Sequence, residues 1–245
     1  MTNGGGSSGY GTIFSINIDG SGFGLLHTFT FGAGDGGYPY GSLTLSGSKF
    51  YGMTSGAGGM IFSVNMNGTG FSQLHSFTGG SSDGSSPVGS LTLSGAKLYG
   101  MTNGGGGTNA GTIFSVNTNG TGYSLLHTFG GSADGYSPFG SLTQSGSTFY
   151  GITEYGGSTN AGTVFGVNTD GTGYGILQNF ARLPTDGAFP IGDVTLSGDA
   201  QTLYGMTSQG GTADSGVIFS VLVPEPSAAL LLAAGAGLLL RRRRG

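Results

Sequence analysis

The 245-residue chain contains no cysteine, which excludes disulfide bonds, thiolate metal sites and thiol redox chemistry. Charge is also scarce, because only 7% of the residues are charged. Four of the seven basic residues form one run, namely Arg241, Arg242, Arg243 and Arg244. Only Lys49, Lys97 and Arg182 lie elsewhere, against eleven acidic residues. A body with three cations cannot neutralise a phosphate backbone, so no nucleic-acid partner is expected.

Helical hydrophobic periodicity is absent before residue 227. Glycine is abundant, with 56 residues, and such a content often signals low complexity. Here, however, 36% of the residues are hydrophobic and 11% are aromatic, and they recur in a fixed order. Disordered chains are poor in aromatics and rich in net charge, so tight turns between short strands explain the glycines better.

The recurring order is a tandem repeat. The segment "TIFSIN" at 12–17 returns in similar form at 60–65, 112–117, 163–168 and 217–222. In the first four copies an Asx-Gly-Ser/Thr-Gly turn and a segment like "LLHTF" come next. An Asp-Gly loop with proline, a "GSLTLSG" segment and a "YGMT" segment complete the unit. The segments are rich in β-branched and aromatic residues and are bounded by turn residues, so each unit predicts four short strands.

A single four-stranded sheet cannot bury both of its faces, yet apolar neighbours such as Ile113 and Phe114 point to opposite faces. Radial stacking of sheets covers both faces. The predicted fold class is therefore all-β: a β-propeller-like ring of about five four-stranded blades, plus a short C-terminal hydrophobic helix. A linear β-solenoid is the rival, although solenoid repeats are usually shorter. The predicted repeat domain spans 1–222, with units near 11–58, 59–110, 111–161 and 162–215 and a partial unit at 216–222.

The strand count leaves the ring incomplete. Residues 12–29 offer two strands without the rest of a sheet, and residues 192–222 offer three strands that lack the fourth. We expect the segment 23–29 to lie on the last sheet and close five blades, with one surplus strand. Because Met1 aligns with the internal methionine of the "YGMT" strand, we also expect that the chain is a fragment or has a misassigned start.

Two sets of polar residues share a position in the repeat. His27, His75 and His127 occupy one position, where the fourth copy has Gln178. A metal site needs its ligands to converge, so we expect these residues to pack or to form hydrogen bonds within each blade.

The second set comprises acidic residues, namely Asp35, Asp83, Asp134 and Asp186. General acid–base catalysis requires two such carboxylates within reach of each other, and symmetric positions on different blades are too far apart unless they face a narrow channel. We expect these aspartates to hold turns.

The remaining motifs do not predict chemistry. The segments at 17–22 and 168–173 echo calcium loops but lack the carboxylates and the distal glutamate. The glycine-rich stretch at 103–111 lacks the lysine of a phosphate loop. We therefore predict no catalytic, cofactor-binding or metal-binding residues, and no enzyme. Four residues break the repeat: Glu154, Tyr155, Arg182 and Asp193. If the chain has a binding site, we expect it in the fourth copy.

The tail differs from the repeat. A charge-free run of 13 residues, Ala228–Leu240, precedes the four arginines Arg241, Arg242, Arg243 and Arg244. As a helix this run spans roughly 20 Å, short of a hydrocarbon core of roughly 30 Å, although snorkelling arginines and bilayer thinning narrow the gap. The four arginines favour a membrane anchor with its basic end inside, and a buried terminal helix is the alternative.

The order of the tail, a short proline motif, an apolar run and a basic end, resembles the PEP-CTERM sorting signal of Gram-negative bacteria. The motif consists of Val223, Pro224, Glu225, Pro226 and Ser227. The resemblance covers 223–245 and implies export, transient anchoring in the inner membrane, and processing by an exosortase near this motif.

The body resembles the GloVer tandem repeat of bacterial surface proteins. The matching pattern is "LYGMT…GG…GTIFSVN…G…LLHTF…DG…P…GSLTLSG", across 1–222. The resemblance supports a propeller on the cell surface and brings no catalytic residue with it. We therefore expect an exported cell-surface or matrix protein with a structural or adhesive role and extracellular polysaccharide as partner. A carbohydrate- or ion-binding propeller is the alternative, and a polysaccharide-acting enzyme comes third. No cofactor is expected.

Overall fold

The computed structural model describes residues 1–224 of the chain. This part is built from short strands and a single 3₁₀ turn, η1 (Gly56–Gly58), which confirms the all-β class. In chain order the strands are β1 (Thr12–Ser15), β2 (Gly24–Thr28), β3 (Pro39–Ser46), β4 (Lys49–Thr54), β5 (Met60–Asn65), β6 (Ser72–Ser76), β7 (Gly84–Ser94), β8 (Lys97–Gly105), β9 (Thr112–Asn117), β10 (Ser124–Thr128), β11 (Tyr136–Ser145), β12 (Thr148–Tyr155), β13 (Thr163–Asn168), β14 (Gly175–Asn179), β15 (Gly187–Leu196), β16 (Thr202–Gly210) and β17 (Ile218–Leu222).

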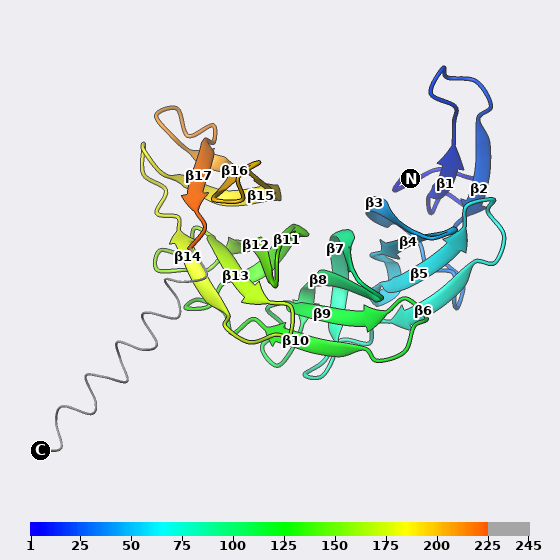
Figure 1. Cartoon of the computed structure of the whole chain (residues 1–245), viewed down its shortest axis with the longest axis horizontal. Helices are drawn as coiled ribbons and strands as arrows, with labels where there is room; N and C mark the ends of the chain where they lie inside the picture. Colours follow the sequence, from blue (N-terminus) through cyan, green and yellow to red (C-terminus); the bar gives the residue numbers. More distant parts are fainter. Residues whose placement is uncertain (225–245) are drawn as a thin grey trace, which may run out of the picture.

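The strands form five antiparallel sheets in which chain neighbours pair. We name them sheet I (β1–β2), sheet II (β3–β6), sheet III (β7–β10), sheet IV (β11–β14) and sheet V (β15–β17). Figure 1 shows the sheets following one another along an open arc, with sheets I and V at its two ends. Each complete sheet takes its first two strands from one predicted unit and its last two from the next, because the sheets begin at the "GSLTLSG" segment.

The hydrophobic core lies in the joints between consecutive sheets. One cluster fills each of the four joints. Between sheets III and IV, for example, Met101 and Ile113 pack with Phe165 and Val167. The third strand of sheets II, III and IV is buried on five successive residues because neighbouring sheets cover both of its faces. Burial of each such side chain contributes about 1.5–3 kcal/mol, so stability depends on stacking of sheets.

The first strands of neighbouring sheets approach closely on the inner side of the arc. A Cβ atom at Gly89, where φ is +80°, would lie 2.0 Å from the carbonyl oxygen of Gly140 in the next sheet. Side chains also bridge these strands: the Ser90 amide donates to Ser141 Oγ at 2.8 Å, and Thr92 Oγ1 donates to the Leu142 carbonyl at 2.6 Å. Glycine is therefore required where the two backbones meet.

The predicted turns are present. In the turn after β5, the Asn67 side chain accepts hydrogen bonds from the amide and hydroxyl of Thr69, at 3.1 and 2.7 Å. Equivalent bonds hold the turns at Asp19, Asn119 and Asp170. A short polar side chain that bonds two residues ahead is the expected Asx turn.

The prediction that the segment 23–29 closes the ring is wrong. The count of two unaccompanied strands at one end and three at the other is confirmed, but β2 pairs with β1 and not with β17. The reason lies in the joint: Ile13 of β1 and Phe29 after β2 pack together on Phe62 of sheet II, which holds the β1–β2 pair at that end of the arc.

The predicted C-terminal helix over 228–240 lies outside the described residues. Within 1–224, the structure has no helix of the length and apolar character needed to cross a membrane.

Candidate functional site

The two rims of the arc carry different connections. Register places Thr153 of β12 opposite Thr163 at one rim, and Thr148 opposite Asn168 at the other. The first, which we name the loop rim, carries the glycine-rich loops and the Asp-Gly loops. The second, the hairpin rim, carries the tight turns within each sheet. Any function that uses loops is therefore concentrated on the loop rim.

The repeated histidines and aspartates pair with each other near the loop rim. Nε2 of His27, His75 and His127 lies 2.5, 3.1 and 3.0 Å from a carboxylate oxygen of Asp35, Asp83 and Asp134 respectively. Each imidazole also stacks on an aromatic ring of the next sheet. The stacked rings are Phe71, Tyr123 and Tyr174, with centroids 3.7 to 3.9 Å apart. The histidines are thus packing and hydrogen-bonding residues, as expected.

The aspartates hold the loops that begin at the end of each fourth strand. Asp35 Oδ2 accepts hydrogen bonds from the amide and hydroxyl of Thr30, and Asp83 does the same with Thr78. The fourth copy lacks the histidine, and Asp186 accepts only from backbone amides. The turn role is confirmed, whereas the pairing with histidine was missed because the two sets were considered separately.

The pKa values of these groups follow from burial and hydrogen bonding. Burial alone would raise the pKa of Asp35, but hydrogen bonds from Thr30 and His27 lower it overall. Burial likewise opposes the net lowering of the pKa of Asp83, which the Thr78 amide, Tyr123 and His75 bring about. Burial lowers the pKa of His127, although Asp134 acts in the opposite direction. Hydrogen bonds thus favour the ionised form of Asp35 and Asp83, and burial favours the neutral form of His127.

Three of the four residues that break the repeat come together on the loop rim. Tyr155, at the end of β12, pairs in register with Tyr136 at the start of β11, and their rings stack with centroids 5.3 Å apart. The ring centroids of Phe189, in sheet V, and Tyr155 lie 5.4 Å apart. The guanidinium carbon of Arg182 lies 5.9 Å from the centre of the Phe189 ring. We name this set, with Glu154 and Asp214, the rim platform.

Charges border the aromatic rings of the rim platform. Arg182 Nη2 donates to Asp214 Oδ2 at 2.8 Å, and both side chains are about half exposed. The hydrogen bond from Arg182 and the Gly210 amide lower the pKa of Asp214. The Glu154 carboxylate raises the pKa of the Tyr155 hydroxyl. The platform thus gathers three rings, one cation and two carboxylates on the loop rim, with Tyr136 and Phe189 partly buried against the joints below. The fourth departing residue, Asp193, lies elsewhere, on β15, where it accepts from the Ser141 amide at 2.6 Å.

The backbone is strained at Arg182 of the rim platform. Arg182 has a φ of +56°, a conformation that favours glycine, and the second and third copies have Gly79 and Gly131 at this position. Phe189 is also in the left-handed region, at +53°, but so are its equivalents Ser86 and Ser137, so this conformation belongs to the repeat. A non-glycine residue in this region costs about 1–2 kcal/mol, and such strain tends to gather at functional sites.

The first copy carries a related cluster at the same repeat positions. Phe31 and Tyr38 correspond to Arg182 and Phe189, with φ of +62° and +56°. Tyr10 stacks on Phe31 at 4.9 Å and meets Tyr38 edge-on at 5.5 Å. The loop rim therefore carries two partly exposed aromatic clusters, one near each end of the arc.

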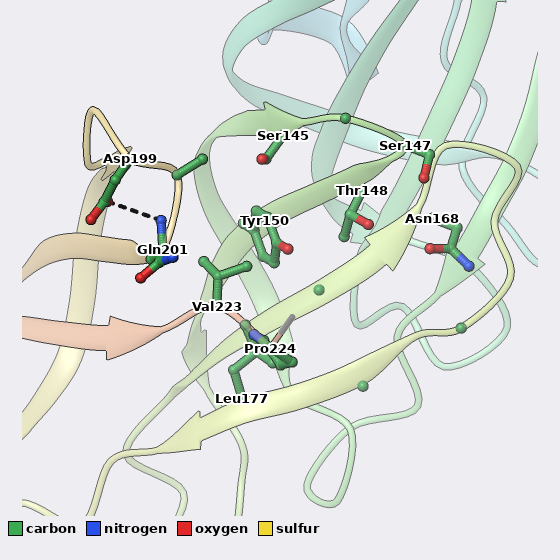
Figure 2. A pocket seen from close by; sticks show the side chains of 15 residues that line it. Ser145, Ser147, Thr148, Tyr150, Asn168, Leu177, Asp199, Gln201, Val223 and Pro224 are labelled. Atoms are coloured by element: carbon green, nitrogen blue, oxygen red, sulfur yellow. Dashed lines mark hydrogen bonds between the residues drawn. The ribbon is translucent and has the colours of Figure 1, made fainter. Parts of the chain in front are cut away.

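A pocket of about 680 Å³ lies at the hairpin rim between sheets IV and V. Figure 2 shows Val223 and Pro224 between Tyr150 and Leu177, and Asp199 accepting a hydrogen bond from the Gln201 amide. Two residues of the predicted sorting motif thus line this pocket.

The rest of the predicted sorting signal lies outside the described residues, which end at Pro224. This part comprises the motif residues Glu225, Pro226 and Ser227 and the basic run Arg241, Arg242, Arg243 and Arg244. The sorting motif and the charge anchor therefore stay predictions from the sequence.

Nothing in this arrangement resembles a metal centre. Among residues 1–224, no three histidine, aspartate or glutamate side chains gather closely enough to hold an ion. The rim platform provides instead a surface for stacking and hydrogen bonding.

The sequence profile of the Gloeobacter/Verrucomicrobia repeat matches residues 1–161, which is more than half of the chain. The chain belongs to this repeat family. The sequence of this chain matches no curated protein.

Solved structures support the propeller fold of this GloVer protein. A putative 6-phosphogluconolactonase from Bacteroides uniformis is 20% identical with a TM-score of 0.56, over 91% of this chain and 64% of its own. A chain of the nidogen/laminin complex is 18% identical with a TM-score of 0.53, over 79% and 63%. Putative TolB from Agrobacterium tumefaciens is 14% identical with a TM-score of 0.50, over 89% and 68%. The protein spans about two thirds of these chains, and the likeness concerns the TolB-like β-propeller fold alone.

Proposed function

We propose that this GloVer protein is an exported cell-surface protein that adheres to extracellular polysaccharide through its rim platform. The observation that carries the proposal is the convergence of Tyr136, Tyr155, Phe189 and Arg182 on one exposed rim. Ring faces suit the C–H faces of sugars, and an arginine with flanking carboxylates suits their hydroxyl groups and acidic substituents. The Tyr10 cluster offers a second contact, and two contacts on one rigid arc increase the avidity for a long polymer.

The direction of β17 agrees with an adhesive role. Met206 pairs with Ile218 toward the loop rim, and Thr202 pairs with Leu222 toward the hairpin rim. The chain therefore leaves the fold at the hairpin rim, opposite the rim platform. If the tail after Pro224 is a sorting anchor, the platform faces away from the membrane.

Likeness to the nidogen/laminin complex supports a binding role in a general way, since that structure is an assembly of two proteins. The three histidines are engaged within the fold. Each contacts an aspartate and stacks on a ring of the next sheet, so the proposal assigns them to packing and not to the rim platform.

Binding to a panel of soluble and insoluble polysaccharides tests the adhesive role. We expect Tyr155→Ala and Arg182→Gln each to weaken binding at least tenfold, about 1.4 kcal/mol. Tyr40→Ala is the matched control, because Tyr40 is a partly exposed tyrosine on β3, outside the platform. If Tyr155→Ala and Arg182→Gln bind as tightly as the control Tyr40→Ala, the proposal is contradicted. Release of reducing sugar from a polysaccharide would assign an enzyme instead.

Fractionation of an exosortase-bearing host tests export separately. We expect the body outside the inner membrane, with processing near Pro224–Ser227. Neutral residues in place of the basic run 241–244 should impair retention, because the positive-inside bias is lost. Intact protein in the cytosol, ending at Gly245, contradicts export without bearing on the platform.

A further inference from the structure

Every joint in the arc uses the same two faces. The face that a sheet turns to the next sheet, which we name its leading face, carries Met101 and Ile113 in sheet III. The face turned to the preceding sheet, the trailing face, carries Phe165 and Val167 in sheet IV. Residues at these positions are buried in the complete sheets. The chain therefore contains repeated copies of one interface.

Among the residues that the structure describes, none covers the leading face of sheet V. Met206 and Ile218 occupy the positions of Met101 and Ile113, yet they are 58% and 79% exposed. Tyr204 beside them is also exposed, whereas its equivalent Tyr99 is buried. Apolar side chains gathered in this way mark an interaction surface.

Sheet I has an uncovered trailing face. Ile16 is 52% exposed, although its equivalents Val64, Val116 and Val167 are fully buried. Phe23 is 63% exposed, and its equivalents are the rings that receive the histidine of the preceding sheet. The two uncovered faces are thus the two halves of the interface that the other joints complete.

We propose that sheet I of one copy packs on sheet V of a second copy, so that chains associate head to tail. The second copy is the occupant because its own joints already show that these two surface types fit each other. The faces lie at opposite ends of the arc in Figure 1, so within residues 1–224 neither end covers the other. The contact is heterologous, and such contacts build closed rings or open filaments.

Site-specific cross-linking tests the assembly on the full chain, because the absence of cysteine gives a clean background. Two single-cysteine variants, Ile16→Cys and Met206→Cys, are treated with a short bis-maleimide alone and as an equimolar mixture. We expect a cross-linked dimer to form at least tenfold more in the mixture than in either variant alone. Leu45→Cys is the control, because Leu45 is similarly exposed but lies on β3 of sheet II, away from both end faces. Association through the apolar tail would cross-link all variants equally and overturn the proposal.

A chain with both Ile16→Cys and Met206→Cys separates two further outcomes. A ladder of cross-linked dimers and larger species supports head-to-tail association. A cross-link confined to the monomer would show that the chain closes its own ring, and would overturn the proposal. Protection of the Met206→Cys thiol in a dilute monomer would show that another part of the same chain covers sheet V, which also overturns it.

Discussion

The imidazole of His127 lies parallel to the ring of Tyr174 in the next sheet, with centroids 3.7 Å apart and planes 5° apart. The same imidazole contacts Asp134 at 3.0 Å, and the Tyr174 hydroxyl donates to the Asp134 carbonyl at 2.6 Å. One histidine thereby joins a loop-holding carboxylate to the packing of two sheets. The histidine–aspartate contact and the ring stack recur at His27 and His75, but the hydroxyl bond does not, because residue 71 is phenylalanine and the Tyr123 hydroxyl has no partner within residues 1–224.

The His75 joint should tolerate glutamine better than alanine. His75→Ala removes the stack on Tyr123 and one partner of the buried Asp83, so we expect a loss of about 1–3 kcal/mol in the free energy of unfolding. His75→Gln should cost less, because an amide can still bond Asp83, and Gln178 occupies this position in the fourth copy. Urea unfolding followed by tyrosine fluorescence measures both. Ser76→Ala is the exposed control, and a loss for His75→Ala no larger than the control's would refute the joint role.

Stability should fall as the pH is lowered from neutral. The folded pKa of His127 is below its ordinary 6.5, so the unfolded chain binds the proton more readily and stability is lost as the pH falls below that value. The folded pKa values of Asp35 and Asp83 lie below 3.8, so their contribution is lost at still lower pH. Denaturation midpoints between pH 7.5 and pH 2 measure the two steps. His127→Gln should reduce only the loss of stability at the higher pH, below 6.5. If the dependence of stability on pH is unchanged in this variant, His127 does not cause that loss.

The inner strands should not accept a side chain at Gly89. Gly89→Ala places a methyl group against the Gly140 carbonyl at a φ of +80°, and we expect a loss of more than about 3 kcal/mol in the free energy of unfolding. Gly95→Ala is the matched control. Its φ is +60° but no atom lies within 4 Å of the added methyl, so only the backbone penalty of about 1 kcal/mol remains. Similar losses for both variants, measured by urea unfolding, would show that the sheets are not held at this close approach.

We expect Arg182 to lower the stability of the fold slightly and to strengthen polysaccharide binding. Arg182→Gly restores the residue found at this position in the second and third copies and relieves a left-handed backbone, while it removes an exposed ion pair worth little. We expect the free energy of unfolding to stay the same or rise by up to about 1 kcal/mol. Polysaccharide binding should fall at the same time. Thermal unfolding and the binding assay measure the two effects on one sample, and a variant that binds fully would remove Arg182 from the proposed site.

Local chemistry let the sequence predict most of the elements. The alternation of β-branched and aromatic segments with Asx-Gly turns gave the strands, and the Asn67 turn has the expected bonds. The counting of segments also predicted two and three strands at the ends of the chain. Because a repeat makes an exception visible, the sequence also showed four departing residues and pointed to the fourth copy. Only the structure shows that Glu154, Tyr155 and Arg182 meet on the loop rim while Asp193 lies elsewhere.

The sequence by itself thus determined the strands, the turns and the radial stacking of sheets, since these depend on residues close together in the chain and on a period. Only the tertiary structure decided that β2 stays on β1, that His75 and Asp83 meet under Tyr123, and that Tyr136 and Phe189 join the platform. Those contacts depend on how one sheet seats on the next. The physical reason is that packing between sheets selects partners by shape and burial, which no single segment of the chain contains.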